Sequence, residues 1–369
     1  MKVQPKGGNM DRRQFVASCS AAMMASWLGS RAEGEAWAGM PKKDKTIRRV
    51  IIDTDPGVDD AFALMLAMRS PELKIEAITA VAGNVPLELT LPNALRMVEI
   101  CERTDIPVAG GASEPLLRKL VTAAYAHGKN GLGGVEFPAP KTKPVPEHAA
   151  ELIARLIRQY PGEITLVPIG PLTNIALALR SDPGMATIVP GIVLMGGSLS
   201  GGNVTPAAEF NFYVDPEAAA IVFDSGIPIT MVGLDVTHKV ELTDERLVRL
   251  EANKTQVSQA AARIARSITE TYRRAGHPGW PILNDPLAVS ALLDPAILKL
   301  TDYHVEIETT GALTAGESVG YRHGDVRTAA PLQSSGGAVP ESAAFHSNCK
   351  VGTGVDVQRF FELLIQRLG

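Results

Sequence analysis

The stretch that most constrains this chain is Ile51-Ile52-Asp53-Thr54-Asp55-Pro56-Gly57-Val58-Asp59-Asp60, which continues directly into the helix-forming residues Ala61–Met68. Apolar residues come first, Pro56-Gly57 follows, and a helical segment begins at once, which predicts a buried strand, a tight turn and a helix N-terminus. The stretch therefore predicts an α/β unit whose acidic residues lie at the carboxyl end of a strand, where open α/β sheets bind ligands.

The acidic residues of this stretch need a second explanation besides helix capping. Asp59 and Asp60 could simply cap the helix, because carboxylates at a helix N-terminus interact favourably with the helix dipole. Capping does not account for Asp53 and Asp55, and neighbouring carboxylates repel one another unless a cation or shared protons offset the charge. Since the available ligands are all oxygen atoms, the stretch predicts a site for a hard ion, Ca²⁺ or Mg²⁺.

Composition narrows the class of protein. The chain has 369 residues, 45% of them hydrophobic, and a formal net charge of -4, enough for one large α/β domain or two smaller ones. The near-neutral charge and the lack of a basic block argue against a nucleic-acid or anionic-membrane partner. No stretch beyond the N-terminal segment reaches the ~20 apolar residues of a membrane span. Cys19, Cys101 and Cys349 lack metal-ligand spacing, and only a Cys101–Cys349 pair is left open.

The N-terminal segment resembles a twin-arginine export signal. Arg12-Arg13-Gln14-Phe15 precedes the small and apolar run Val16–Leu28, and Ala36-Trp37-Ala38 offers a cleavage pattern. The alternative is an N-terminal extension with two chance arginines. We expect a cleaved signal over residues 1–38, a linker over 39–48, a single α/β domain over 49–369, and an exported, periplasmic protein.

Strand-like and helix-like segments alternate after the linker. Strands are predicted at Lys74–Val81, Pro107–Ala109, Ile164–Pro168, Ile188–Met195 and Pro228–Val232, and helices at Leu87–Glu102, Glu147–Gln159, Leu172–Leu179, Pro216–Phe223, Asp244–Ala275, Pro286–Leu293 and Val357–Leu368. Tyr303–Tyr321 is typical of antiparallel strands. The prediction is an α/β fold with a doubly wound, mostly parallel sheet flanked by helices and a small antiparallel β excursion near the C-terminus. Residues 324–350 fit no pattern.

Polar groups directly follow several of these strands. Asp53, Asp55, Asn84, Ile169-Gly170 and Met195-Gly196-Gly197 each come at a strand end, and the clusters Asn203–Asn211 and Asn284-Asp285 could join them. Each group alone is ordinary turn chemistry. Because the carboxyl ends of parallel strands meet at one crevice, the whole set predicts a shared site for a polyol and a cation.

With these motifs the chain resembles the Ca²⁺-dependent nucleoside hydrolases, the inosine–uridine-preferring group that cleaves N-ribosidic bonds. The resemblance runs from about Arg49 to the C-terminal helix. It rests on the D-x-D-P-G-x-D-D opening at Asp53–Asp60, on Val81–Asn84, Val167–Asn174, Leu194–Gly197 and Val214–Ala219, and on the Asn203–Asn211 cluster.

The resemblance implies roles for individual residues. Asp55 would bind Ca²⁺ and act as general base towards a water bound to that ion, with Asp60, the Ile169 carbonyl and Asp285 as further metal ligands and Asp53 behind them. Asp59, Asn84 and Asn211 would hold the ribose 2′- and 3′-hydroxyls, and Asn203 and Glu209 the 5′ side. The implied partners are a small nucleoside substrate and further copies of the chain, as a dimer or tetramer.

The chemistry suits these residue types. Departure of the base leaves an oxocarbenium-like ribosyl cation, which carboxylates stabilise, while Ca²⁺ accepts the many oxygen ligands of a crowded site.

One position departs from the family pattern. Asn284 stands where many members carry a histidine that protonates the leaving base, and a neutral amide cannot supply a proton. His127, in a motif of the form H-G-x-x-G-L, Tyr272 or His277 could take over, Trp280 could stack on the base, or the substrate needs no acid. The alternatives for these residues are an exposed loop histidine and ordinary aromatic packing.

Two other functions compete with nucleoside hydrolysis. An Mg²⁺-dependent phosphatase would use Asp53 as nucleophile, but it leaves the Asn-rich cluster unexplained and crowds negative charge around a dianionic substrate. An exported, non-catalytic nucleoside- or sugar-binding protein would keep the same polar groups without turnover.

Overall fold

The computed structural model describes residues 47–276, 279–322 and 347–369. They belong to one compact unit, Ile47–Gly369. The expected signal at 1–38, nearly all of the expected linker, His277 and most of the unassigned 324–350 segment lie outside the described residues.

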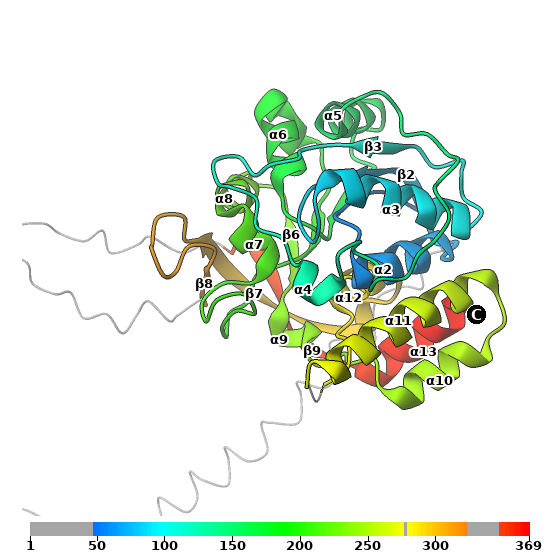
Figure 1. Ribbon diagram of the computed structural model, residues 1–369. Coiled ribbons are helices and arrows are strands. Elements are labelled where there is room, and N and C mark those ends of the chain that lie inside the picture. The colour runs from blue at the N-terminus through cyan, green and yellow to red at the C-terminus, as the bar shows by residue number, and fades with distance from the viewer. Residues whose placement is uncertain (1–46, 277–278, 323–346) are drawn as a thin grey trace, which may run out of the picture. The chain divides into compact units, whose positions relative to one another are not determined.

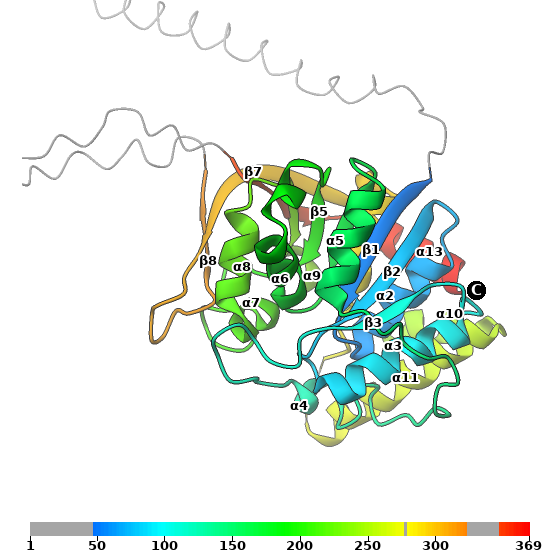
Figure 2. The ribbon, with the colours of Figure 1, turned by 90° about the horizontal axis from the view of Figure 1, so that it is seen from above.

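Within the described residues, nine strands form one sheet, ordered β3-β2-β1-β4-β5-β6-β9-β7-β8 (Figures 1 and 2). The strands are β1 Arg48–Thr54, β2 Leu73–Ala80, β3 Val108–Gly110, β4 Ile164–Pro168, β5 Ile192–Met195, β6 Ile229–Val232, β7 Leu298–Ile307, β8 Ser318–Tyr321 and β9 Cys349–Val355. All pairings from β3 to β9 are parallel, whereas β7 is antiparallel to both β9 and β8. The predicted fold class is confirmed.

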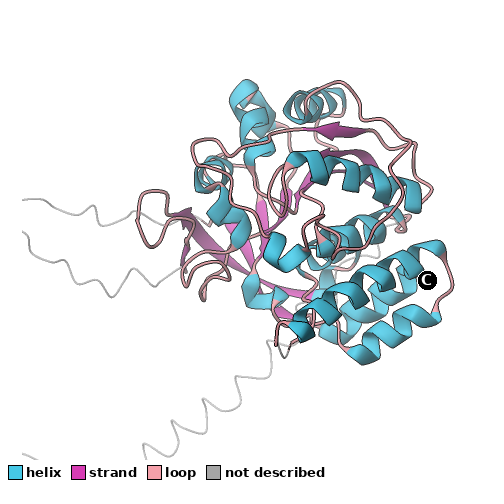
Figure 3. Cartoon of the chain, in the orientation of Figure 1, coloured by secondary structure: helices cyan, strands magenta, loops and turns pink. Residues whose placement is uncertain are grey.

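Helices flank the strands on both faces of the sheet (Figure 3). They are α2 Val58–Met68, α3 Leu87–Ile100, α4 Ala124–His127, α5 Ala149–Gln159, α6 Thr173–Ser181, α7 Phe210–Val214, α8 Pro216–Phe223, α9 Leu234–Thr237, α10 Asp244–Ala252, α11 Gln256–Arg274, α12 Asn284–Leu293 and α13 Val357–Leu368, with 3₁₀ turns η1 Pro183–Thr187 and η2 Pro295–Ile297.

The core has two parts because alternate residues of a strand point to opposite faces. In β1, Val50 and Ile52 join the cluster that contains α2, α3, α11, α12 and α13, whereas Ile51 joins the cluster that contains α5, α6 and α8. All residues of α2 are buried, and all except Asp59 and Asp60 are apolar, which fits a helix that is enclosed by the core. The helix that follows the acidic stretch is therefore a central element of the core.

The short helices α4, α7 and α9 were not predicted, and β7 begins at Leu298 instead of Tyr303. Three further differences have a local explanation. The helix predicted over Asp244–Ala275 is two helices, because the chain breaks after α10 and the Thr255 side chain caps α11 by accepting a hydrogen bond from the Ser258 amide. The strand predicted from Ile188 begins only at Ile192, since residues 188–191 form a turn and an irregular segment after η1. β9 was not predicted, because its two glycines weaken a strand pattern.

The cysteine pair that the sequence left open is not formed. Cys101 and Cys349 are both buried and free, and burial raises the pKa of each thiol to about 12. Among the described residues, no helix is both long enough and apolar enough to cross a membrane.

Candidate active site

The polar residues of the prediction meet in one cleft at the carboxyl ends of β1, β2, β4 and β5. Its lining is Asp59, Asn84, Ala123, Tyr125, Ala126, His127, Ile169, Met195, Asn203, Glu209, Phe210, Asn211, Asn284 and Asp285. Asp55 and Asp60 are fully buried next to these residues. Every predicted site residue that the structure describes thus lies in or beside the cleft.

Asp60 organises the turn between β1 and α2. Its Oδ1 accepts hydrogen bonds from Thr54 Oγ1 at 2.6 Å and from the Asp55 amide at 3.2 Å. Its Oδ2 accepts from the Gly57 amide and from Asn84 Nδ2, both at 2.9 Å. Helix capping, which the sequence offered as one explanation for Asp60, therefore accounts for its hydrogen bond with the Gly57 amide. It does not account for the hydrogen bond with Asn84.

Asp55 presents one oxygen atom without a protein partner. The Asn84 amide donates to its Oδ2 at 2.6 Å, while Oδ1 is buried and has no hydrogen-bond partner among the described residues. Burial, followed by the charge of Asp60, holds the pKa of Asp55 well above its usual range. An unpartnered carboxylate oxygen in such a place is suited to bind a cation or to accept a proton.

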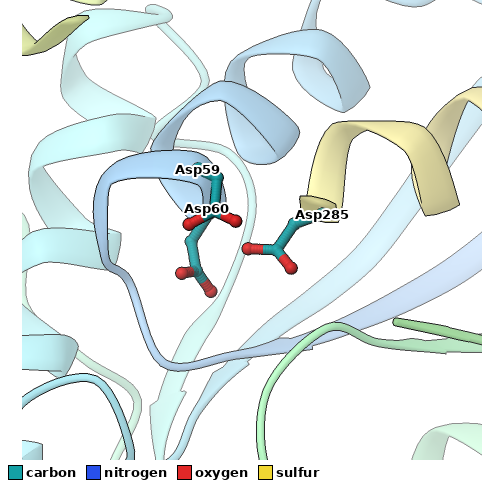
Figure 4. A group of neighbouring side chains, drawn as sticks. All are labelled: Asp59, Asp60 and Asp285. Carbon is teal, nitrogen blue, oxygen red and sulfur yellow. The ribbon is translucent and has the colours of Figure 1, made fainter. Parts of the chain in front are cut away.

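Three buried carboxylates lie close enough to share an ion. One oxygen atom each from Asp59, Asp60 and Asp285 lies within 4.8 Å of the other two. Figure 4 shows Asp59 and Asp60 at the start of α2, facing Asp285 near the start of α12. Burial, and then the charges of Asp59, Asp60 and Asp55, raise the pKa of Asp285 well above its usual range. Together with Asp55 Oδ1, this all-oxygen set fits a divalent hard cation.

The amide side chains and Glu209 are held by backbone groups. Asn211 Nδ2 donates to the carbonyls of Ile169 and Met195, both at 3.2 Å, and Asn203 Oδ1 accepts from the Phe210 amide at 2.9 Å. Glu209 caps α7, and its carboxylate accepts from three backbone amides, those of Gly197, Asn211 and Phe212. Burial raises the pKa of Glu209 to about 7. These side chains are thus fixed in orientation before any ligand binds.

The Asp59 carboxylate lies between His127 and Asn284. Asn284 Nδ2 donates to Asp59 Oδ2 at 2.8 Å, and His127 Nδ1 lies 3.7 Å from Asp59 Oδ1. His127 Nδ1 also accepts a hydrogen bond from the Val58 amide at 3.0 Å. In a neutral imidazole that accepts at Nδ1, the proton is on Nε2, so His127 is set up as an Nε2–H donor.

A second, mostly apolar hollow adjoins the cleft and shares Tyr125 and Ala126 with it. Its lining is Tyr125, Ala126, Thr271, Tyr272, Ala275, Gly279 and Trp280. The structure therefore places the two predicted aromatic candidates, Tyr272 and Trp280, in one wall beside the cleft. Sequence reasoning missed Tyr125, whose only signal is its place two residues before His127.

Asp53 lies behind the cleft. It is fully buried, and its Oδ1 accepts hydrogen bonds from Thr79 Oγ1 and Asn174 Nδ2. Burial raises its pKa to about 7. A nucleophile must reach its substrate, so this position argues against the phosphatase alternative.

Comparisons with known proteins agree on one family. Residues 50–362 match the family described as inosine-uridine preferring nucleoside hydrolase. The chain is 49% identical to the pyrimidine-specific ribonucleoside hydrolase RihA of Photobacterium profundum over 274 residues. These residues cover 74% of this chain and 88% of that relative. The chain is 46% identical to the protein of the same name from a Shewanella species over 324 residues. These residues cover 87% of this chain and 96% of that relative.

Solved structures of the same kind share the fold. A plant nucleoside hydrolase, the PpNRh1 enzyme, superposes with a TM-score of 0.78 at 34% identity, over 87% of this chain and 99% of that one. A purine-preferring ribonucleoside hydrolase from Gardnerella vaginalis superposes with a TM-score of 0.77 at 33% identity, over 87% and 98% of the two chains.

Proposed function

The chain belongs to the inosine-uridine preferring nucleoside hydrolase family and is a ribonucleoside hydrolase, and we propose that it acts on pyrimidine ribonucleosides with Ca²⁺ as its metal. The reaction splits the N-glycosidic bond and yields the free base and ribose. The pyrimidine preference is supported by the names of the relatives that are 46–49% identical to this chain.

The observation that carries the metal proposal is the buried cluster of Asp59, Asp60 and Asp285, in which one oxygen atom of each lies within 4.8 Å of the other two. Asp55, Asp60 and Asp285 would hold Ca²⁺ through their carboxylates and Ile169 through its carbonyl. Once bound, Ca²⁺ would polarise a water molecule and the ribose hydroxyls and offset the repulsion between the carboxylates. Ca²⁺ suits this crowded set better than Mg²⁺, which requires a tight octahedron and keeps its own waters.

Asp55 is the general base of the proposal. Its Oδ1 is the oxygen that makes no hydrogen bond among the described residues, and it accepts the proton of the attacking water. Oδ2 is meanwhile held by the Asn84 amide at 2.6 Å, so the carboxylate keeps one orientation while the proton moves.

The ribose is oriented by side chains of the same cleft. Asp59, Asn84 and Asn211 bind the 2′- and 3′-hydroxyls, and Asn203 and Glu209 bind on the 5′ side. As the bond to the base breaks, positive charge develops on the ribosyl ring, and the buried carboxylates beneath it stabilise that charge without having to reorganise.

The leaving base is assisted from the His127 side of the cleft. His127 Nε2–H donates towards the departing base, whereas Asn284 holds Asp59 and supplies no proton. The hollow lined by Tyr125, Tyr272 and Trp280 offers apolar and aromatic surface for the base.

A panel of nucleosides tests the proposal. Purified protein is incubated with uridine, cytidine, inosine and adenosine, and ribose release is measured as reducing sugar. We expect uridine and cytidine to be cleaved with the higher kcat/KM. Faster cleavage of inosine would overturn the pyrimidine preference, and binding without release from any nucleoside would favour the non-catalytic binding protein.

Export and assembly are separate proposals. Residues 1–38 are proposed to be a twin-arginine signal that directs the protein to the periplasm, on the strength of Arg12-Arg13 and the run after them. Cell fractionation of the wild-type chain and of an Arg12→Lys/Arg13→Lys variant tests this, with retention of the variant inside the cell as the expected result. A homo-oligomer, dimer or tetramer, is expected from the family resemblance, and light scattering after gel filtration measures it.

A further inference from the structure

We propose that Asn93 is a positioning residue that fixes the loop carrying His127 against the turn carrying the catalytic aspartates. We call residues 53–60 the aspartate turn and residues 127–135 the His127 loop. The inference rests on the proposed function, because it assigns Asn93 an effect on departure of the base.

Asn93 joins these two segments through a single side-chain nitrogen. It lies on α3 and is 1% exposed. Its Nδ2 donates to the Pro56 carbonyl at 3.0 Å and to the Asn130 carbonyl at 2.9 Å. Its Oδ1 accepts a hydrogen bond from Arg96 Nη1 at 2.8 Å. Both N–H groups and the oxygen are therefore engaged, and the amide has one orientation.

The carbonyl on the aspartate side belongs to a rigid part of the turn. Pro56 precedes Gly57, whose amide donates to Asp60 Oδ2 at 2.9 Å. Asp60 in turn binds Thr54 and Asn84. The Pro56–Gly57 peptide is thus held by the hydrogen bonds of Asp60 as well as by Asn93.

The carbonyl on the other side belongs to a loop that folds around Asn130. The Asn130 side chain accepts hydrogen bonds from the amides of Leu132 and Gly134, both at 3.0 Å, and donates to the Val135 carbonyl at 2.9 Å. The Gly133 amide donates to the His127 carbonyl at 2.8 Å. His127 and Asn130 are therefore parts of one locked unit, and what holds Asn130 also holds His127.

The two segments approach so closely that glycine is required on both sides. A Cβ on Gly131, whose φ is +82°, would lie 2.9 Å from both Asn93 Nδ2 and the Pro56 carbonyl oxygen. A Cβ on Gly57 would lie 2.4 Å from His127 Nδ1. The hydrogen bond from the Val58 amide to His127 Nδ1 forms across this contact. Asn93 supplies the donors that satisfy the carbonyls of Pro56 and Asn130 in a buried place.

Loss of Asn93 should therefore displace the imidazole rather than the carboxylates, which keep their own network. A displacement of about 1 Å can cost about 100-fold in rate when a reacting group must be aligned. The loss should be selective: uridine needs help at its leaving base, whereas para-nitrophenyl riboside carries a good leaving group and does not.

The test compares these two substrates in one enzyme preparation, because the ratio of the two rates does not depend on the fraction of folded protein. Asn93→Ala is expected to lower kcat on uridine by about 10- to 100-fold and on para-nitrophenyl riboside by much less. Gly131→Ala, which pushes Asn93 and Pro56 apart by another route, should give the same selective loss.

The matched control is Ser258→Ala. Ser258 is fully buried, and its hydroxyl contacts two carbonyls, those of Asn253 and Thr255, in a part of α11 that does not line the cleft. This variant should keep the wild-type ratio of the two rates.

A double-mutant cycle with His127→Ala shows whether Asn93 acts through the histidine. In the His127→Ala background, Asn93→Ala should cause little further loss on uridine. Equal losses on both substrates, additive losses in the double mutant, or a wild-type ratio in His127→Ala would each overturn the inference. Failure of the wild-type enzyme to release ribose from either riboside would instead contradict the proposed function.

Discussion

Gly83 lies directly against the carboxylate of Asp55: a Cβ on Gly83 would be 2.1 Å from Asp55 Oδ2. On the other side of the carboxylate, a Cβ on Gly170 would be 2.6 Å from Oδ1. Gly83 follows β2 and Gly170 follows β4, so the backbone after two strands that flank β1 encloses the proposed general base. Glycine at both positions is what allows this close approach.

Gly83→Ala is expected to lower kcat by about 100-fold, because the methyl group would force the Asp55 carboxylate out of line. The overall fold should persist, since the change is confined to the loop after β2. Steady-state kinetics and circular dichroism measure the two effects. Gly354→Ala in β9 is the control, where a Cβ would meet only the Lys299 side chain at 3.3 Å and beyond. A Gly83→Ala enzyme with wild-type kcat would contradict the placement of the base.

Asp55→Ala and Asp60→Ala should both abolish turnover but differ in stability. Asp60 accepts hydrogen bonds from four donors and Asp55 from the Asn84 amide. Each buried donor that loses its acceptor lowers the free energy of unfolding by about 1–3 kcal/mol. Asp60→Ala should therefore unfold at a lower temperature than Asp55→Ala. Calorimetry on both variants gives the comparison. Equal melting temperatures would show that Asp60 does not organise the turn as described, and near-normal turnover in either variant would refute the assignment of the metal site.

Asn284→His should restore an acid beside the leaving base. The side-chain Nδ2 of Asn284 donates to Asp59 Oδ2. An imidazole in place of this side chain would lie near the Asp59 carboxylate, which favours the protonated form of the imidazole. We expect the rate on inosine relative to para-nitrophenyl riboside to rise about tenfold or more, within the range of general acid catalysis. Asn284→Gln is the control that adds no titrating group. An unchanged ratio in Asn284→His would mean that this position does not face the leaving base.

Glu209 gives the metal-free protein a stability that depends on pH. Burial raises its pKa from 4.5 to about 7, so the folded state binds this proton more tightly than the unfolded chain does. The contribution of Glu209 to the free energy of unfolding is fully present below about pH 4.5 and is lost as the pH rises through about 7. With chelator present, the melting temperature should fall across this range, and less so in Glu209→Gln. Parallel curves for the two proteins would exclude Glu209 as a source of the dependence.

Local patterns in the sequence were enough for the central strand, turn and helix. The segment Asp53–Asp60 follows an apolar strand, contains the turn residues, and includes the carboxylate that caps α2. Its structure therefore follows from neighbouring residues. The meeting of Asn84 and Ile169 followed from the rule that parallel strands place their carboxyl ends at one edge. Asp285 lies in α12 instead, and only the family resemblance assigned it to the site.

What the sequence could not predict depends on contacts between distant segments. Asn93 occupies a helix position that gives no sign of its two carbonyl partners, 37 residues away in each direction. Tyr125 joins the cleft only because the long loop after β3 folds back over it. β9 pairs in parallel with β6 and antiparallel with β7, and no pattern within its own seven residues specifies those neighbours.

The most direct test of the central claim is ribose release from uridine by metal-free protein, before and after Ca²⁺ is added back. The protein is stripped with a chelator, dialysed, and assayed for reducing sugar with added Ca²⁺ or Mg²⁺. The account predicts no release from the stripped enzyme, full recovery with Ca²⁺ and weaker recovery with Mg²⁺. Undiminished release from protein shown by elemental analysis to carry no metal would contradict it.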